Sequence, residues 1–203
     1  MEYLVTMTTR VPAGTPDAAV DDIRADEARR AAELARSGQL LRLWRPPLQP
    51  GEWRTLGLFS APDDERLERA LASMPLRVWR RDEPLRLVPH PNDPATAGVG
   101  PAGFAGSEFL ITMTVTVPPG TAPAQLDDLL SREARRAREL ASQGHLLRLW
   151  SLPAAPGVHR ALGLWCAGGD AEIAAIVDAL PLRPWMAVES MPLTPHPNDP
   201  AGH

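Results

Sequence analysis

The chain contains one sequence unit written twice, and this internal repeat constrains its fold more than any other feature. Matching segments of the two copies are separated by 106 positions throughout, so the copies align without a gap. The clearest pairs are 6–8 with 112–114, 27–31 with 133–137, 40–44 with 146–150, and the Pro-His-Pro-Asn-Asp-Pro segments at 89–94 and 195–200. Two copies are too few for a solenoid, so we predict a covalently linked pseudo-dimer.

The repeat divides the sequence into three parts. We expect repeat 1 over residues 1–94, a linker over 95–106 and repeat 2 over 107–203. The segment 95–106 is rich in Gly and Ala, a composition typical of a flexible connection.

Composition excludes several classes of protein. The net charge of −4 gives no electrostatic reason to expect a nucleic-acid or anionic-membrane partner. No apolar run approaches the roughly 18 to 20 residues that span a bilayer, and the N-terminal residues do not resemble a signal peptide, so we expect a cytoplasmic protein. The single cysteine, Cys166, allows neither an internal disulfide nor a cysteine-based metal cluster.

Each copy has the pattern β-α-β-β-α-β. In the first copy, runs of apolar and β-branched residues predict strands at 3–11, 39–45, 53–60 and 83–88. Ala-rich periodic segments that stop at Pro or Gly predict helices at 17–36 and from Asp63 or Asp64 to about Met74. This order defines the ferredoxin-like unit, an antiparallel sheet with both helices on one face. We therefore predict an α+β fold of two tandem ferredoxin-like repeats, whose open sheet faces can cover each other and form a barrel within one chain.

A carboxylate interrupts the apolar stripe of the first long helix. Glu27 lies in register with Val20, Ile23, Ala31 and Leu34, and Glu133 occupies the same place in the second copy. A carboxylate that faces an apolar interior must be paired, hydrogen-bonded or protonated, and burial raises its pKa toward neutrality. The pattern fits a proton-transfer group, but it also fits a structural ion pair with an arginine such as Arg42, or exposure at the edge of the stripe.

Both copies resemble muconolactone Δ-isomerase over essentially their whole length. No single motif carries the resemblance, which rests on the ordered set of the opening strand, 24–27, the Gly38 turn into 41–45, the turn at 74–76 and the terminal His90-Pro91. Members of this family are similar in fold to dimeric α/β-barrel proteins. The resemblance implies a proton transfer that moves a double bond in an unsaturated lactone, with a small-molecule substrate and with neither metal nor organic cofactor. It leaves open whether the pseudo-dimer forms a homo-oligomer, as single-repeat relatives do.

Such a reaction needs a base beside a conjugated carbonyl and a group that stabilises the dienolate oxygen. The resemblance makes Glu27 and Glu133 the candidate bases, and His90 and His196 are candidate acids that also fit a purely structural C-terminal turn. Candidate substrate-binding residues are repeated arginines and tryptophans, of which the tryptophans fit a core role as well: Arg42, Arg148, Arg54, Arg160, Trp44, Trp150, Trp79 and Trp185.

The sequence departs from the family at several of these positions. Family members usually carry a lysine just before the glutamate, where this chain has Arg24 in one copy and Leu130 in the other, and the chain contains no lysine at all. The family's histidine on the following strand is replaced by Arg42 and Arg148. The second copy diverges further, so the first copy is the better candidate for chemistry.

The sequence therefore favours a cofactor-independent isomerase or cyclase that acts on an unsaturated lactone or a related conjugated carbonyl compound. The substrate need not be muconolactone, and an intermediate of specialised metabolism fits equally. Two alternatives are a non-catalytic small-molecule-binding protein on the same barrel and a cofactor-free monooxygenase.

Overall fold

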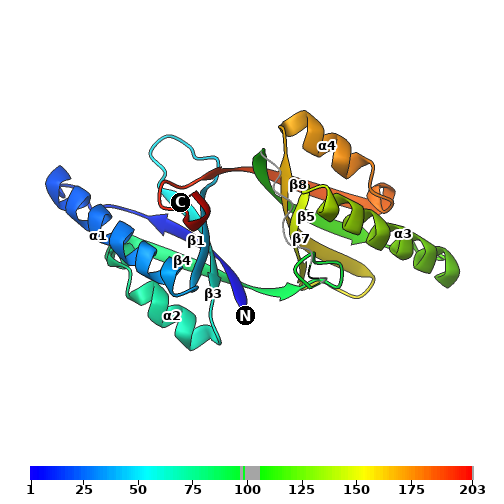
Figure 1. Cartoon of the computed structure of the whole chain (residues 1–203), viewed down its shortest axis with the longest axis horizontal. Helices are drawn as coiled ribbons and strands as arrows, with labels where there is room; N and C mark the ends of the chain where they lie inside the picture. Colours follow the sequence, from blue (N-terminus) through cyan, green and yellow to red (C-terminus); the bar gives the residue numbers. More distant parts are fainter. Residues whose placement is uncertain (97, 99–105, 203) are drawn as a thin grey trace. The chain divides into compact units, whose positions relative to one another are not determined.

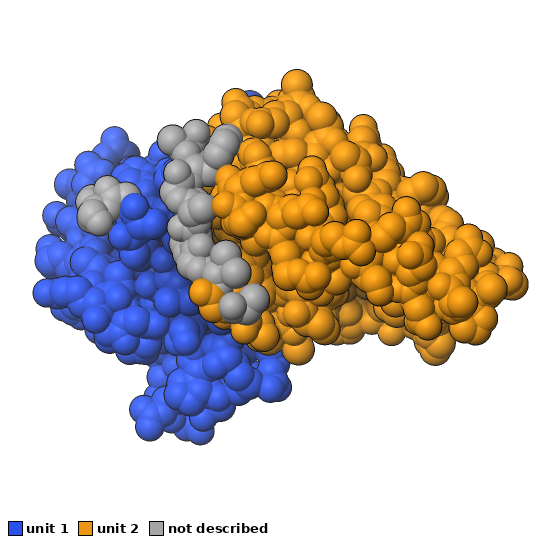
Figure 2. Space-filling model, turned by 45° about the vertical axis from the view of Figure 1, so that its right-hand side comes forward, with its two compact units in different colours: residues 1–87, 194–203 blue, residues 88–193 orange. Residues whose placement is uncertain are grey.

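The chain folds into two compact units that do not coincide with the two sequence repeats. The computed structural model describes residues 1–96, 98 and 106–202, so most of the predicted linker at 95–106 lies outside the described residues. Unit 1 comprises residues 1–87 together with the C-terminal tail from Thr194, and unit 2 comprises residues 88–193 (Figure 2). Each unit thus contains the body of one repeat and the tail of the other.

The element order in both repeats is the predicted β-α-β-β-α-β. Repeat 1 consists of β1 (Glu2–Thr9), α1 (Asp17–Arg36), β2 (Leu40–Arg45), β3 (Arg54–Ser60), α2 (Asp64–Ala72), the 3₁₀ turn η1 (Pro75–Trp79) and β4 (Arg80–Pro89). Repeat 2 consists of β5 (Ser107–Thr116), α3 (Pro123–Ser142), β6 (Leu146–Leu152), β7 (Val158–Ala167), α4 (Asp170–Asp178), η2 (Arg183–Trp185) and β8 (Met186–Pro195), followed by η3 (Pro200–Gly202).

The helix boundaries follow from local residue chemistry. Helix α1 ends where Gly38 adopts a φ of +70°, a conformation that favours glycine. Helix α2 begins at an Asp63 cap, whose carboxylate accepts a hydrogen bond from the backbone N–H of Arg66 at 2.7 Å. Strand β4 begins at Arg80, three residues before the predicted Glu83, because it directly follows η1.

Strand β1 is the centre of the unit 1 sheet, with antiparallel partners β3 and β4 on its two sides, while β2 pairs with the far side of β3. Helices α1 and α2 cover one face of this sheet (Figure 1). The core between them is built from apolar side chains of both layers, among them Val5, Leu34, Phe59 and Leu71. Unit 2 repeats the arrangement with β5 between β7 and β8, and its core includes Ile111, Leu140, Trp165 and Ile173.

The last residues of each repeat add to the sheet of the other unit. Trp44 and Arg45 of β2 pair with Pro195 and Thr194 of β8, and Trp150 and Ser151 of β6 pair with Pro89 and Val88 of β4. The hydrogen-bonded order of the strands is therefore cyclic, β1-β3-β2-β8-β5-β7-β6-β4. Tandem ferredoxin-like repeats with this strand order confirm the predicted fold class.

A buried aspartate fastens each tail. Asp199 is 2% exposed and accepts hydrogen bonds from the backbone N–H of Leu43 at 2.9 Å and from Arg42 Nη2 at 3.0 Å. In unit 2, Asp93 accepts the corresponding bonds from Leu149 N–H at 3.0 Å and Arg148 Nη2 at 3.2 Å. The Pro-His-Pro-Asn-Asp-Pro segments are thus held by the same two contacts in both units.

Replacing Asp199 by Ala is expected to destabilise unit 1 by about 3 kcal/mol, because it removes the buried carboxylate that accepts hydrogen bonds from the Arg42 guanidinium and the Leu43 N–H. Urea unfolding of the full chain measures the free-energy change. Asp199→Asn, which keeps a side-chain oxygen, should lose less. An Asp199→Ala chain as stable as the wild type would contradict a fastening role for this contact.

Candidate functional site

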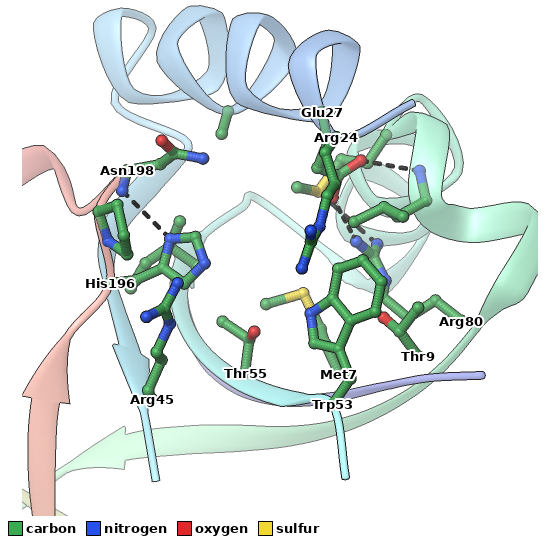
Figure 3. A pocket seen from close by; sticks show the side chains of 15 residues that line it. Met7, Thr9, Arg24, Glu27, Arg45, Trp53, Thr55, Arg80, His196 and Asn198 are labelled. Carbon is green, nitrogen blue, oxygen red and sulfur yellow. Dashed lines mark hydrogen bonds and ion pairs between the residues drawn. The ribbon is translucent and has the colours of Figure 1, made fainter. Parts of the chain in front are cut away.

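Unit 1 contains a cavity of about 310 Å³ between α1 and the sheet, called cavity 1 here. The side chains around it come from α1, from the four strands of repeat 1 and the segments beside them, and from the C-terminal tail (Figure 3). Its polar and charged lining consists of Thr9, Arg24, Glu27, Arg45, Trp53, Thr55, Arg80, His196 and Asn198, and its apolar lining includes Met7, Ala31, Leu43, Met74 and Leu76.

Glu27 is the buried carboxylate of this cavity, with only 8% of its surface exposed. Its Oε2 accepts a hydrogen bond from the backbone N–H of Leu76 at 2.8 Å, and its Oε1 accepts one from Arg80 Nη1 at 2.7 Å. The apolar stripe of α1 turns this side chain inward, and the Met74–Pro75 turn brings the Leu76 N–H to it. Two donors therefore fix the orientation of the carboxylate.

Arg80 connects Glu27 to a second buried carboxylate. Its Nε donates to Asp82 Oδ1 at 2.6 Å and its Nη2 to Asp82 Oδ2 at 3.2 Å. Burial raises the pKa of Glu27, which the Leu76 N–H and the Arg80 guanidinium oppose and the Asp82 charge reinforces. The balance leaves Glu27 a stronger proton acceptor than an ordinary glutamate.

The predicted burial of Glu27 is confirmed, and so is an ion pair with an arginine, but the partner is not the Arg42 that the sequence suggested. Its partner is Arg80, at the first position of β4 and opposite Thr9 of β1. Sequence reasoning missed Arg80 because it placed residues 80–82 before the strand. The signal was present, since an Arg two positions before an Asp in a strand places both side chains on one face.

His196 reaches cavity 1 from the tail of the other repeat. Its backbone N–H donates to the Leu43 carbonyl at 3.0 Å, and its Nδ1 accepts the Asn198 N–H at 3.1 Å. Burial, with a further contribution from the positive charge of Arg45, lowers the pKa of His196 to about 4, against an opposing effect of Asp199. The ring is therefore neutral near pH 7, and because Nδ1 is an acceptor, Nε2 carries the proton. In Figure 3 the ring lies across the cavity from Glu27.

Two arginines lie at the mouth of cavity 1. Arg24 has 56% of its side chain exposed and stacks on Trp53, with 4.6 Å between the guanidinium carbon and the ring centre. Arg45 is exposed on β2 beside the tail. Both guanidinium groups are placed to attract an anionic group of a ligand.

The predicted substrate-binding pair Arg42 and Arg148 contacts the tails. Arg42 binds Asp199 and stacks on Trp44 at 4.8 Å, and Arg148 binds Asp93 and stacks on Trp150 at 5.0 Å. None of these residues is among those that line the cavities of either unit in the described part of the chain. Their predicted contact with substrate stays a prediction without geometric support.

The remaining candidates are divided between the units. Arg54 donates to Glu52 at 3.3 Å and does not line cavity 1, whereas its counterpart Arg160 lies at the mouth of the unit 2 cavity. Trp79 and Trp185 are half-buried, and Trp185 packs against the unit 2 core.

The corresponding cavity of unit 2, called cavity 2, has a volume of about 360 Å³. Glu133 lines it and accepts the Leu182 N–H at 3.0 Å, and burial raises the pKa of Glu133 against the effect of that bond. Where unit 1 has Arg80 and Asp82, unit 2 has Met186 and Val188. Among the described residues, no cation forms an ion pair with Glu133. His90 takes the place of His196, and burial lowers its pKa.

Comparison with known proteins identifies the family. The muconolactone delta-isomerase family matches residues 1–93 and again residues 107–199. The chain belongs to this family. Muconolactone Delta-isomerase of Cupriavidus pinatubonensis is 29% identical over 90 residues, which cover 44% of this chain and 95% of that protein. The Rhodococcus opacus muconolactone Delta-isomerase is 29% identical over 91 residues, covering 45% of this chain and 95% of that protein.

A solved structure is similar over both repeats. It is described as a novel heme-binding protein from Thermus thermophilus, with 14% identity and a TM-score of 0.63, and it covers 98% of this chain and 93% of that one. At this identity the likeness concerns the fold alone.

Within the described residues we find no group of three His, Cys, Asp or Glu side chains arranged to hold a metal ion. None of the helices described is long and apolar enough to cross a membrane.

The double variant Arg80→Met with Asp82→Val gives Glu27 the neighbours that Glu133 has, and it is expected to raise the pKa of Glu27. The guanidinium lowers this pKa more than the Asp82 charge raises it, so their joint removal leaves burial less opposed. Carboxyl-carbon NMR of the two glutamates over a pH series measures the shift, with Glu133 in the same sample as the control. A Glu27 pKa that stays constant or falls would contradict the conclusion that Arg80 lowers this pKa more than Asp82 raises it.

Proposed function

We propose that unit 1 is a cofactor-independent isomerase that moves a double bond in an unsaturated lactone or a related conjugated carbonyl compound. The observation that carries this proposal is Glu27, a buried carboxylate that lines a cavity, is oriented by two donors and has a pKa raised by burial. A proton-transfer base that operates near neutral pH needs this combination. Membership of the muconolactone delta-isomerase family supports the same chemistry.

The reaction consists of two proton transfers through one intermediate. The Glu27 carboxylate takes a proton from a carbon conjugated with the lactone carbonyl, and the electron pair of the broken C–H bond delocalises to give a dienolate. The Glu27 carboxylic acid then returns the proton to a different carbon of the conjugated system. No atom is gained or lost, so the product differs from the substrate only in the position of the double bond.

The dienolate oxygen needs a hydrogen-bond donor, and His196 is suited to supply it. Its Nδ1 is occupied by the Asn198 N–H, so the proton on Nε2 is available to a ligand in cavity 1. A neutral imidazole stabilises developing negative charge without first releasing a proton to Glu27. His196 thus takes part as an electrophilic partner of the base.

The mouth of cavity 1 favours a substrate that also carries an anionic group. Arg24 and Arg45 line the entrance. The Arg24–Asp21 contact is long, at 3.8 Å, and exposed, and Arg45 forms no ion pair with any residue that the structure describes. Their charges raise the local concentration of an anionic lactone and orient its carboxylate away from Glu27. Arg80 is already bound to Glu27 and Asp82, so we assign it a positioning role.

Glu27→Gln is expected to lower kcat for muconolactone isomerisation by about 100- to 10,000-fold, because the amide keeps the shape of the side chain but cannot accept the proton. The matched control is Glu133→Gln, which should retain most of the activity if unit 1 carries it. In the wild type, kcat/KM should fall as the pH falls through the pKa of Glu27. Binding of the lactone without turnover by the wild type would instead indicate a non-catalytic binding protein.

His196→Ala is expected to lower kcat by about 100-fold through loss of the donor to the dienolate oxygen. His196→Gln, whose side-chain N–H₂ can replace Nε2–H, should recover part of that loss, and His90→Ala is the matched control in unit 2. The acidic limb of the pH profile should keep its position in the alanine variant, since that limb belongs to Glu27. A limb that moved or vanished would show that His196 is the base.

A further inference from the structure

We infer that cavity 2 is a second binding site, specific for an uncharged and mainly apolar small molecule. This inference is independent of the reaction proposed for unit 1. It rests on a comparison of the two cavities at positions that the sequence repeat makes equivalent.

At four positions a polar side chain that lines cavity 1 is replaced by an apolar side chain that lines cavity 2. These exchanges are Thr9 to Val115, Arg24 to Leu130, Thr55 to Ala161, and Arg80 to Met186. Glu27, His196 and Asn198 are retained as Glu133, His90 and Asn92, and Trp53 becomes the exposed His159. A fifth exchange, Arg45 to Ser151, removes another cation. The apolar frame is retained, with Ala137, Leu149 and Leu182 in place of Ala31, Leu43 and Leu76.

Further apolar side chains enlarge the apolar wall of cavity 2. Val117, Leu126, Leu146 and Trp165 line it. With a volume of about 360 Å³ it is also the larger of the two cavities. A concave apolar site with few polar groups is typical of a small-molecule pocket.

The polar groups of cavity 2 favour an uncharged ligand. Glu133 is its inner charged group, and within the described residues no cation forms an ion pair with it. A ligand carboxylate placed beside Glu133 would lose its hydration and meet a like charge, with no inner arginine to offset either effect.

Two further groups, Arg160 and His159, are exposed at the mouth, where Arg160 donates to the Pro153 carbonyl at 3.5 Å. They can contact a polar end of a ligand that points to solvent. Inside the cavity, Glu133 is the charged group. Its uncharged polar neighbours are Trp165, whose buried indole N–H has no hydrogen-bond partner, and His90 and Asn92 from the tail.

The methionines allow a test on the unmodified full chain. Met7 and Met74 line cavity 1, Met113 and Met186 line cavity 2, and the exposed Met1 and Met191 provide internal references. Methyl-labelled methionine NMR can therefore locate a ligand directly. The two probes are a butenolide with an n-pentyl chain and a butenolide of similar length whose chain ends in a carboxylate.

The neutral probe is expected to shift Met113 and Met186 and to bind cavity 2 about 10-fold or more tightly than the carboxylated probe does. Met186→Arg, which restores the cation of unit 1, should reverse this preference at the Met113 signal. The inference is overturned if the neutral probe shifts Met7 and Met74 as strongly, if it binds neither cavity up to its solubility, or if both probes bind cavity 2 equally. Loss of turnover in Glu27→Gln bears only on the reaction in unit 1 and leaves these shifts unaffected.

Discussion

The hydrogen bonds of Asp199 and Asp93 hold in place the segments on which both cavities depend. Each carboxylate is almost fully buried, and each accepts a bond from a backbone N–H on a strand and from the arginine just before it. Fastening Asp199 to Leu43 places His196 and Asn198 at the edge of cavity 1. The repeated Arg42 and Arg148 therefore contribute to the sites indirectly, through the tails that they hold.

Much of the fold could be predicted because helices and strands depend on sequence patterns within a few residues. The first helix matches residues 17–36, and the strands begin or end within a few residues of their predicted limits, because apolar periodicity and Pro or Gly stops act over short distances. The inward position of Glu27 was likewise visible from the spacing of the α1 stripe. What a pattern within one helix could not provide was the partner of Glu27, since Arg80 lies 53 positions away and only the sheet register brings it near.

The sequence also could not predict that the tail of each repeat packs in the unit formed by the other repeat, and the reason is different. Both repeats carry the same six residues, at 89–94 and 195–200, so each tail has the same contact groups and fits either unit equally well on local grounds. The path of the chain decides which tail joins which unit, and His196 therefore lines the same cavity as Glu27 although the two residues belong to different repeats.

The departures from the family also acquire a physical meaning. Arg24 stacks on Trp53 at the mouth of cavity 1, while Leu130 adds to the apolar wall of cavity 2.

Tail exchange also has a consequence for how such a protein can evolve. In an assembly of identical single-repeat subunits, every substitution appears in all sites at once, so a change that improves one site for a new ligand removes the old specificity everywhere. Fusion of two repeats removes that restriction, because equivalent positions can then change separately. In this chain one such pair differs, with Arg80 in one unit and Met186 in the other. The exchanged tails nevertheless keep the two halves interdependent, because the histidine of each cavity is encoded in the opposite half of the gene.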